Sequence, residues 1–284
     1  MLGGIIVVLA ISFAVVWFFS GYKYFFATPG VRSSFAQSKA IYEEDLAAIQ
    51  KARDDENRVA SLVAKTGNRK TVEDLLTEVS ENQTKVLQNN TNLVVNTIAF
   101  EEMTVPFSWI MAKRHMLSGV NELIAWKEDS KKYFELASPY YNIVSDVAEY
   151  KDSVANQNFD KQNNNDAIAS HTKLKALCDE ILAQTKILST VSGKDFENLT
   201  KYFTKASAYH DKNIAFYQAD QRRDTATQKD LSNDVTSLKN ELAKMNPLTD
   251  LEDLQASHLA PLRDTLKDEE SRITSDYNIF KDKN

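Results

Sequence analysis

The chain has 284 residues, of which 43% are hydrophobic, so it can bury a sizeable core and an intrinsically disordered chain is excluded. Its seven glycines and five prolines are too few for the many turns of an all-β or doubly wound fold, which leaves a mostly helical protein. The single cysteine, Cys178, excludes a disulfide framework and a cysteine-cluster metal site within one chain, and the net charge of −6 argues against nucleic-acid binding.

The chain opens with an apolar segment. Residues 2–19 contain one polar residue and no charge, and extension to Tyr22 gives the roughly 20 residues that a membrane-spanning helix needs. Aromatic residues gather at its C-terminal end, so we expect Trp17, Tyr22 and Tyr24 to lie at the membrane–water interface. No basic residue precedes the segment and no small-residue cleavage site follows it, which disfavours a cleaved signal peptide. Residues 1–28 are therefore predicted to be an uncleaved transmembrane anchor.

The charges beside this anchor leave its orientation open. Lys23, Arg32 and Lys39 follow the apolar run, and the positive-inside rule would keep the C-terminal part in the cytoplasm. The acidic run 43–45 comes directly afterwards, which keeps an exported C-terminal part as the alternative. We expect a single-pass membrane protein whose C-terminal part lies on a side that the sequence does not fix.

The first half of the remaining chain has the periodicity of packed helices. Apolar residues recur at spacings of three and four over 33–65, and Thr71 then caps a second helix. Pro106 ends that helix and can open a third. Ser138 and Pro139 are predicted to end the third helix and to begin a fourth, because serine caps helices and proline favours their first turn.

A polar segment divides the predicted helices into two groups. Residues 156–166 are the most polar stretch of the chain, and we expect a loop there that separates one part of the bundle, 31–158, from a second part, 166–284. The fifth helix follows this loop and is predicted to end at Gly193, since glycine commonly closes helices.

The last predicted helices are long. The sixth runs from about 194 to 245, with a polar interval at 218–230 where it either projects past its neighbours or breaks. Leu238 falls in a clean apolar register and is predicted to be an inner residue. A capping box at Thr249 begins the last helix, which Pro261 should kink. Long helices joined by short turns predict an all-α, elongated antiparallel helical bundle.

The motifs of common chemistries are absent, and we expect no enzyme, cofactor or metal site. None of the four histidines lies in a Glu-x-x-His or His-Glu-x-x-His motif, and the scattered glycines make no phosphate-binding loop. Cys178 and His210 fall on apolar helix faces, where a buried structural role is favoured. The acidic runs 43–45 and 54–56 lack the spacing of a calcium loop, and we interpret them as solvated helix faces.

Residues 72–103 carry a seven-residue repeat. Aliphatic residues occupy its first position, and Asn82, Asn89 and Asn96 occupy its fourth. This pattern resembles the asparagine layers of trimeric coiled-coil stalks, such as those of trimeric autotransporter adhesins, which implies a trimer with inward amides. On a straight helix of 3.6 residues per turn, the three asparagines instead fall at the wet edge of the apolar stripe of a monomeric bundle. We favour the monomeric bundle over a homo-oligomer.

Aromatic residues gather in the third and fourth predicted helices. We interpret them as core residues, and the functional alternative is a groove for a partner helix formed by Trp109, Trp126, Tyr140 and Tyr141.

These features predict a non-catalytic, membrane-anchored helical scaffold or tether. We expect its partners to be the lipid bilayer and proteins of a membrane-associated assembly, bound through helix-mediated contacts. The alternative function is an extracytoplasmic sensing or ligand-binding helical bundle.

Overall fold

The structure, a computed structural model, contains helices and no strand in the part of the chain that it describes, which comprises residues 27–63, 65, 69–157, 159 and 162–283. This confirms the predicted all-α class. Within this part, no helix combines the length and the apolar character needed to cross a membrane. The predicted anchor run lies outside the described residues, as do Trp17, Tyr22 and Tyr24.

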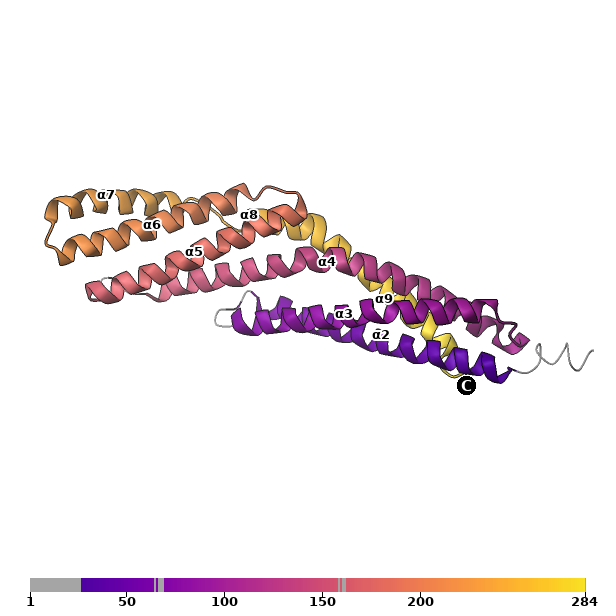
Figure 1. The fold of residues 1–284 in the computed structure, drawn as a ribbon. Helices are drawn as coiled ribbons and strands as arrows, with labels where there is room; N and C mark the ends of the chain where they lie inside the picture. Colours follow the sequence, from indigo (N-terminus) through magenta and orange to yellow (C-terminus); the bar gives the residue numbers. More distant parts are fainter. Residues whose placement is uncertain (1–26, 64, 66–68, 158, 160–161, 284) are drawn as a thin grey trace, which may run out of the picture. The chain divides into compact units, whose positions relative to one another are not determined.

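The helices follow one another along the chain with short connections (Figure 1). Their order is α2 (Pro29–Leu62), α3 (Arg69–Glu102), the short 3-10 helix η1 (Phe107–Trp109), α4 (Ile110–Asn156), α5 (Asn164–Ser192), α6 (Glu197–Gln221), α7 (Thr225–Leu242), α8 (Thr249–Leu254), the π-helical turn η3 (Gln255–Leu259) and α9 (Ala260–Phe280).

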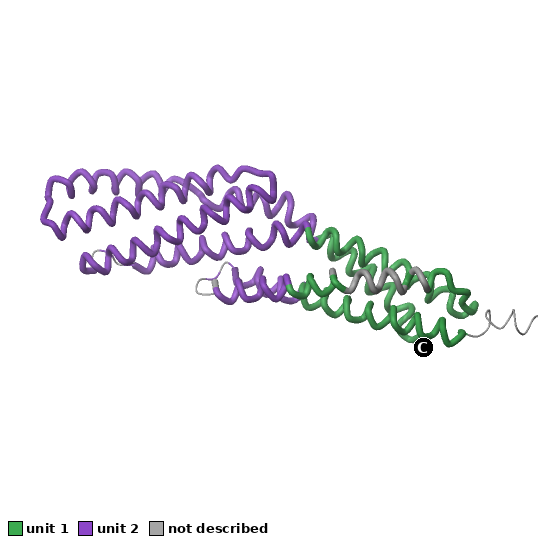
Figure 2. The backbone as a smooth tube through the Cα atoms, viewed as in Figure 1, with its two compact units in different colours: residues 1–52, 81–131, 264–284 green, residues 53–80, 132–263 purple. Residues whose placement is uncertain are grey.

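The chain forms two compact units (Figure 2). Unit 1 comprises residues 1–52, 81–131 and 264–284, and unit 2 comprises residues 53–80 and 132–263. Because α2, α3 and α4 are long, each contributes residues to both units.

This division corrects the predicted boundary. The polar segment 156–166 does interrupt the helices, but it joins α4 to α5 inside unit 2 and does not separate the units. Polar composition marks where a helix ends, whereas unit membership depends on which helices pack together. The apolar stripes of successive helices carry no information about their partners.

Aromatic rings hold the helices of unit 1 together. The ring of Phe35 in α2 lies 5.7 Å from Phe100 of α3, 5.0 Å from Trp109 of η1 and 6.1 Å from Phe280 of α9. Farther along α2, the buried Tyr42 hydroxyl donates a hydrogen bond to the backbone carbonyl of Ile273 in α9, at 2.8 Å. Edge-on ring pairs of this kind stabilise a core beyond their buried area.

Unit 2 contains the antiparallel run α5, α6 and α7 (Figure 1). Asn163 caps α5 by accepting the Asp166 N–H at 3.0 Å, and Gly193 closes the helix with φ 66°, as predicted. The start of α6 has no cap from its own chain neighbours. Asp250 of α8 supplies one, because its carboxylate accepts the N–H groups of Asn198 at 2.8 Å and Leu199 at 3.1 Å.

One predicted helix boundary needs correction. Pro139 does not end a helix, since α4 continues through it with Ala137, Tyr140 and Tyr141 all buried. A proline inside a helix costs about 3 kcal/mol, and packing on both sides can offset this. Near Pro261, the turn η3 accommodates the proline, with the Ala260 N–H bonded to the carbonyl five residues earlier.

The predicted helix over residues 194–245 breaks within its polar interval. Helix α6 ends at Gln221, Arg223 adopts a left-handed φ of 60°, and Asp224 caps α7 by accepting the Thr227 N–H at 3.1 Å. The chain therefore turns back and lays α7 along α6.

The prediction that Asn82 lies at a wet edge of α3 is wrong. Its side chain is buried, between the buried residues Val79 and Val86, so the apolar stripe of α3 is continued by an amide at this point. The side chains of Asn89 and Asn96 lie outside the described part of the structure.

Candidate functional site

The four aromatic residues proposed for a partner groove are buried, and they lie in different units. Trp109 and Trp126 belong to unit 1, whereas Tyr140 and Tyr141 belong to unit 2. The Tyr140 hydroxyl donates to Gln255 at 2.9 Å, and the Tyr141 hydroxyl donates to Glu56 at 2.9 Å. Their burial favours the interpretation that they form core.

An incompletely covered surface occurs instead on α7. Its apolar residues recur at spacings of four, three and four, yet none of its 18 residues is buried. The half-buried stripe comprises Leu231, Val235, Leu238 and Leu242. Leu238, which is predicted to be an inner residue, is half-buried, because α7 packs on α6 and its stripe keeps solvent-accessible edges.

Ion pairs between the two helices fix the position of α7 on α6. Lys212 of α6 pairs with Asp234 of α7 at 2.7 Å, and Lys205 pairs with Glu241. Tyr209 and Phe216 fall on the same face of α6 as these lysines, by helical spacing, and both are half-buried. Exposed ion pairs typically contribute less than about 1 kcal/mol of stability. These pairs therefore define the register of α7 on α6 but contribute little to the strength of its packing.

A neighbouring face of α6 is buried and carries His210. The Nε2 atom of His210 lies 3.1 Å from the Tyr150 hydroxyl of α4, and its Nδ1 lies 2.9 Å from Nδ1 of His171 in α5. Phe159 stacks on the His171 ring at 4.2 Å. One Nδ1 donates its proton and the other accepts it, so this geometry requires at least one neutral ring.

Burial controls the charge of this cluster. It lowers the pKa of His171 to about 4, and burial together with the neighbouring His171 ring lowers the pKa of His210 to about 3, against ordinary values of 6.5. Burial also raises the pKa of the Cys178 thiol to about 12. At neutral pH all three groups are uncharged, which gives the cysteine no thiolate with which to act as a nucleophile. Within the described residues, no group of three or more His, Cys, Asp or Glu side chains is placed to hold a metal ion.

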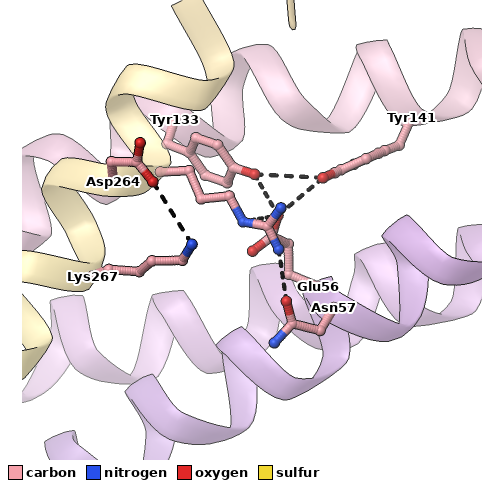
Figure 3. A network of polar contacts seen from close by, with 7 residues as sticks. Glu56, Asn57, Tyr133, Tyr141, Asp264 and Lys267 are labelled. Carbon is pink, nitrogen blue, oxygen red and sulfur yellow. Dashed lines mark hydrogen bonds and ion pairs between the residues drawn. The ribbon is translucent and has the colours of Figure 1, made fainter. Parts of the chain in front are cut away.

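A second buried polar cluster surrounds Glu56 (Figure 3). Tyr133 and Tyr141 of α4 both donate hydrogen bonds to the Glu56 carboxylate, and Nε of Arg263 lies 3.6 Å from it. Arg263 also donates to Asn57 at 2.6 Å. Burial is the largest cause that raises the pKa of both tyrosines, and the Glu56 carboxylate adds to it, so both remain proton donors. Through these contacts the cluster links α2, α4 and the start of α9 within unit 2.

The two acidic runs of α2 are partly buried. Asp45, Asp55 and Glu56 are buried, so the interpretation of these runs as solvated faces is wrong at those positions. The helical spacing indicates the burial of Glu56, because Ala52, Glu56 and Val59 lie on one buried stripe of the helix. Burial of Cys178 and His210 on their predicted apolar faces is confirmed, whereas the pairing of His210 with His171 depends on how α5 and α6 dock.

Unit 2 also has a cleft of about 560 Å³ between α5 and the start of α6. It is lined from residues 182–189 and 195–201, and it carries the charged side chains of Lys186, Asp195 and Glu197 beside Phe196. Its size suits a small ligand.

No protein-family model matches the chain, and no curated protein or solved structure is significantly similar to it.

Proposed function

We propose that the protein is a non-catalytic, single-pass scaffold or tether. In this proposal, residues 1–28 form a transmembrane helix with Trp17, Tyr22 and Tyr24 at the membrane interface, and the helical units bind protein partners of a membrane-associated assembly. The observation that carries the proposal is the stripe of α7, an apolar surface with regular helical spacing that its own unit covers only in part.

The stripe of α7 has the features of a helix-docking surface. Its apolar residues repeat in the pattern by which an amphipathic partner helix is recognised, with anchors three and four residues apart. Full burial of a leucine or valine side chain contributes roughly 1.5–3 kcal/mol. A partner helix that completes the burial of these four residues would therefore gain a substantial part of its binding free energy from them. Charged residues on both sides of the stripe would orient the partner.

Photo-crosslinking in native membranes tests this partner surface. A photoreactive phenylalanine analogue placed at Leu238 of the full chain should form an adduct with another protein. The same analogue at Asn240, which lies on the opposite, exposed face of α7, is the matched control and should form none. Absence of an adduct at Leu238, or equal adducts at both positions, would count against the proposal.

The membrane anchor needs a separate test. The full chain should stay with membranes in alkaline carbonate, and the double variant Leu9→Arg/Val15→Arg should be released, because charged residues in the middle of a spanning helix are costly. A Ser33→Arg variant adds a charge outside the apolar run and should behave as wild type. Release of the unaltered chain by carbonate would contradict the anchor.

The alternative, an extracytoplasmic sensing or ligand-binding bundle, is supported by the cleft between α5 and α6. A ligand bound there would raise the unfolding temperature of the protein by mass action. Replacement of the exposed Thr200 by Trp would fill the cleft and abolish that rise. A screen of charged small molecules in which no compound produces a Thr200-dependent shift would exclude this alternative.

A further inference from the structure

We infer that one end of unit 1 docks onto the surface of a lipid bilayer, through apolar side chains at the start of α4. This inference rests on the proposed function, because it takes the bilayer to be the one that the N-terminal anchor enters. It assigns to the described part of the chain a second membrane contact that the anchor does not require.

The docking surface consists of exposed apolar residues around a single turn. Pro106 precedes η1, and the turn places Trp109 in the interior while its neighbours face outward. The exposed fraction is 64% for Phe107, 47% for Ile110 and 56% for Met111. Single exposed apolar side chains are ordinary, but three large ones within five residues form a patch of the kind that marks an interaction site.

Packing places this patch at the same end of unit 1 as the start of α2. The Phe35 ring, less than two turns after Pro29, lies 5.0 Å from Trp109 and 6.1 Å from Phe280. The last turn of α9 adds Ile279, which is 45% exposed. Figure 1 shows the start of α2, the turn before α4 and the C-terminus at this end of the unit.

The chain leading into α2 limits the distance between this end and the membrane. Six residues, and thus seven Cα–Cα steps, separate Tyr22, at the end of the apolar run, from Pro29. Even fully extended, they span at most about 25 Å. A bilayer that holds the anchor therefore lies within reach of the patch, which favours lipid over a second copy of the chain or another protein as the occupant.

The charges at this end are mixed, so the docking is expected to depend on apolar insertion. Arg114 and Lys281 are exposed, but so are Glu101 and Glu102. Lys113 donates to the backbone carbonyls of Glu101 at 2.6 Å and Met103 at 2.9 Å. Its positive charge thus stabilises the C-terminal end of α3. Binding should not require anionic lipid, in contrast to a polybasic surface.

Collisional quenching tests the inference in the full chain. Met111→Cys is labelled with an environment-sensitive fluorophore and reconstituted into phosphatidylcholine vesicles with or without a nitroxide on the lipid acyl chains. Native Cys178 is fully buried, so labelling is directed to the introduced cysteine. Ser12→Cys reports on the anchor, and Ile187→Cys is the matched control, because Ile187 is also apolar and 50% exposed but lies on α5.

We expect the nitroxide to lower the emission at positions 111 and 12 at least twofold and to leave position 187 unchanged. Quenching at 12 without quenching at 111 would overturn the inference and leave the anchor intact. No quenching at 12 would overturn the proposed anchor itself. A blue-shifted but unquenched probe at 111 would identify a protein occupant, and equal quenching at 187 would indicate general adsorption. Both results would contradict the inference. Ile110→Cys provides a second probe of the same surface and should agree with position 111.

Discussion

In unit 2 the buried carboxylate of Glu56 accepts hydrogen bonds from Tyr133 and Tyr141, and His210 bonds to both Tyr150 and His171. In unit 1 the polar links between helices include the bond from the Tyr42 hydroxyl to the Ile273 carbonyl and the pair formed by His115 and Asp276. Both units also enclose buried polar atoms without a hydrogen-bond partner in the described structure, such as Asn82 Nδ2 and Lys127 Nζ in unit 1 and Asp55 Oδ2 and His171 Nε2 in unit 2. The units therefore differ in the groups that connect their helices, because unit 2 has a pair of fully buried histidines, whereas His115 of unit 1 is half-buried.

This difference predicts different responses to perturbation. A buried donor or acceptor without a partner costs about 1–3 kcal/mol, whereas a satisfied network fixes one arrangement of helices. Burial lowers the pKa of Lys127 to about 8, which is a sign of how poorly its charge is accommodated, although Asp45 acts in the opposite direction. We expect unit 2 to be the more sensitive to acid, because its network includes two buried histidines.

Acid should destabilise unit 2 before unit 1. His171 and His210 have pKa values of about 4 and 3 in the folded chain, against 6.5 when unfolded, so below pH 6.5 the unfolded chain binds more protons. Their contribution is complete above pH 6.5 and is lost as the pH falls toward 3. At pH 5 the loss is about 2 kcal/mol for each histidine. Hydrogen exchange, corrected for intrinsic rates, should show α5 and α6 losing protection at pH 5 before α9 does.

A variant provides the control for this acid response. His258 is partly exposed and bonds to Ser257, so His258→Gln should keep the pH dependence of unit 2. An acid response confined to unit 1, or one altered by His258→Gln, would break the comparison.

Gly119→Ala should cost unit 1 about 2–3 kcal/mol, because overpacking adds to the loss of a buried hydrogen bond. A Cβ at residue 119 would lie 2.9 Å from two ring carbons of Tyr42, and displacing that ring breaks its bond to the Ile273 carbonyl. Denaturant unfolding of the full chain in detergent measures the effect. Gly30→Ala is the control, since its Cβ would meet no atom within 4 Å. Equal stabilities of the Gly119→Ala and Gly30→Ala variants would show that the Tyr42 ring can move aside without loss of stability.

Tyr133→Phe should destabilise unit 2 by about 2 kcal/mol, because hydrogen bonds to a charged group contribute about 1.5–3 kcal/mol. Tyr140→Phe, on the same helix, removes a hydrogen bond to the neutral Gln255 and should cost only about 1 kcal/mol. The difference, measured as the free energy of unfolding, sharpens the view that the Glu56 cluster stabilises unit 2. If both variants lower the free energy of unfolding equally, the bond to the Glu56 carboxylate contributes no more stability than a bond to a neutral amide.

Asn82→Leu should stabilise unit 1 by about 1 kcal/mol. It removes a buried amide whose Nδ2 has no partner in the described structure and continues the apolar stripe of Val79 and Val86. Gln88→Leu places the same side chain at an exposed site of α3 and should change stability by less than about 0.5 kcal/mol. A loss of stability in Asn82→Leu would mean that the amide is satisfied after all.

The sequence predicted the helical class and most helix ends, because caps, glycines and apolar spacing act locally. Gly193 ended α5 as expected, and Cys178 and His210 were placed correctly on buried faces. Pro139 was misjudged because its cost as a helix breaker is local while the packing that offsets it is not. Whether a polar residue of a helix faces the core is likewise decided by a partner helix. The inward position of Glu56 depends on the tyrosines of α4 that donate to it.

The candidate surfaces were harder to predict than the core. The register of Leu231 to Leu242 identified an apolar stripe, but a stripe looks the same whether its own bundle covers it completely or in part. The break at Arg223 determines the outcome, since it lays α7 against α6 and leaves the edges of its stripe accessible. The exposed turn at Phe107 has no local sequence signal of its own, because composition does not distinguish the inward Trp109 from its outward neighbours.

The most direct test of the scaffold is the protein mass of the full chain extracted from its native membranes in mild detergent, measured by light scattering with the detergent contribution subtracted. We predict a protein mass above the 32.1 kDa of one chain. The double variant Val235→Ser/Leu238→Ser should reduce it to the mass of one chain, whereas Asn240→Ser should not. A wild-type protein mass of 32.1 kDa, or a larger mass indifferent to the α7 stripe, would contradict the account.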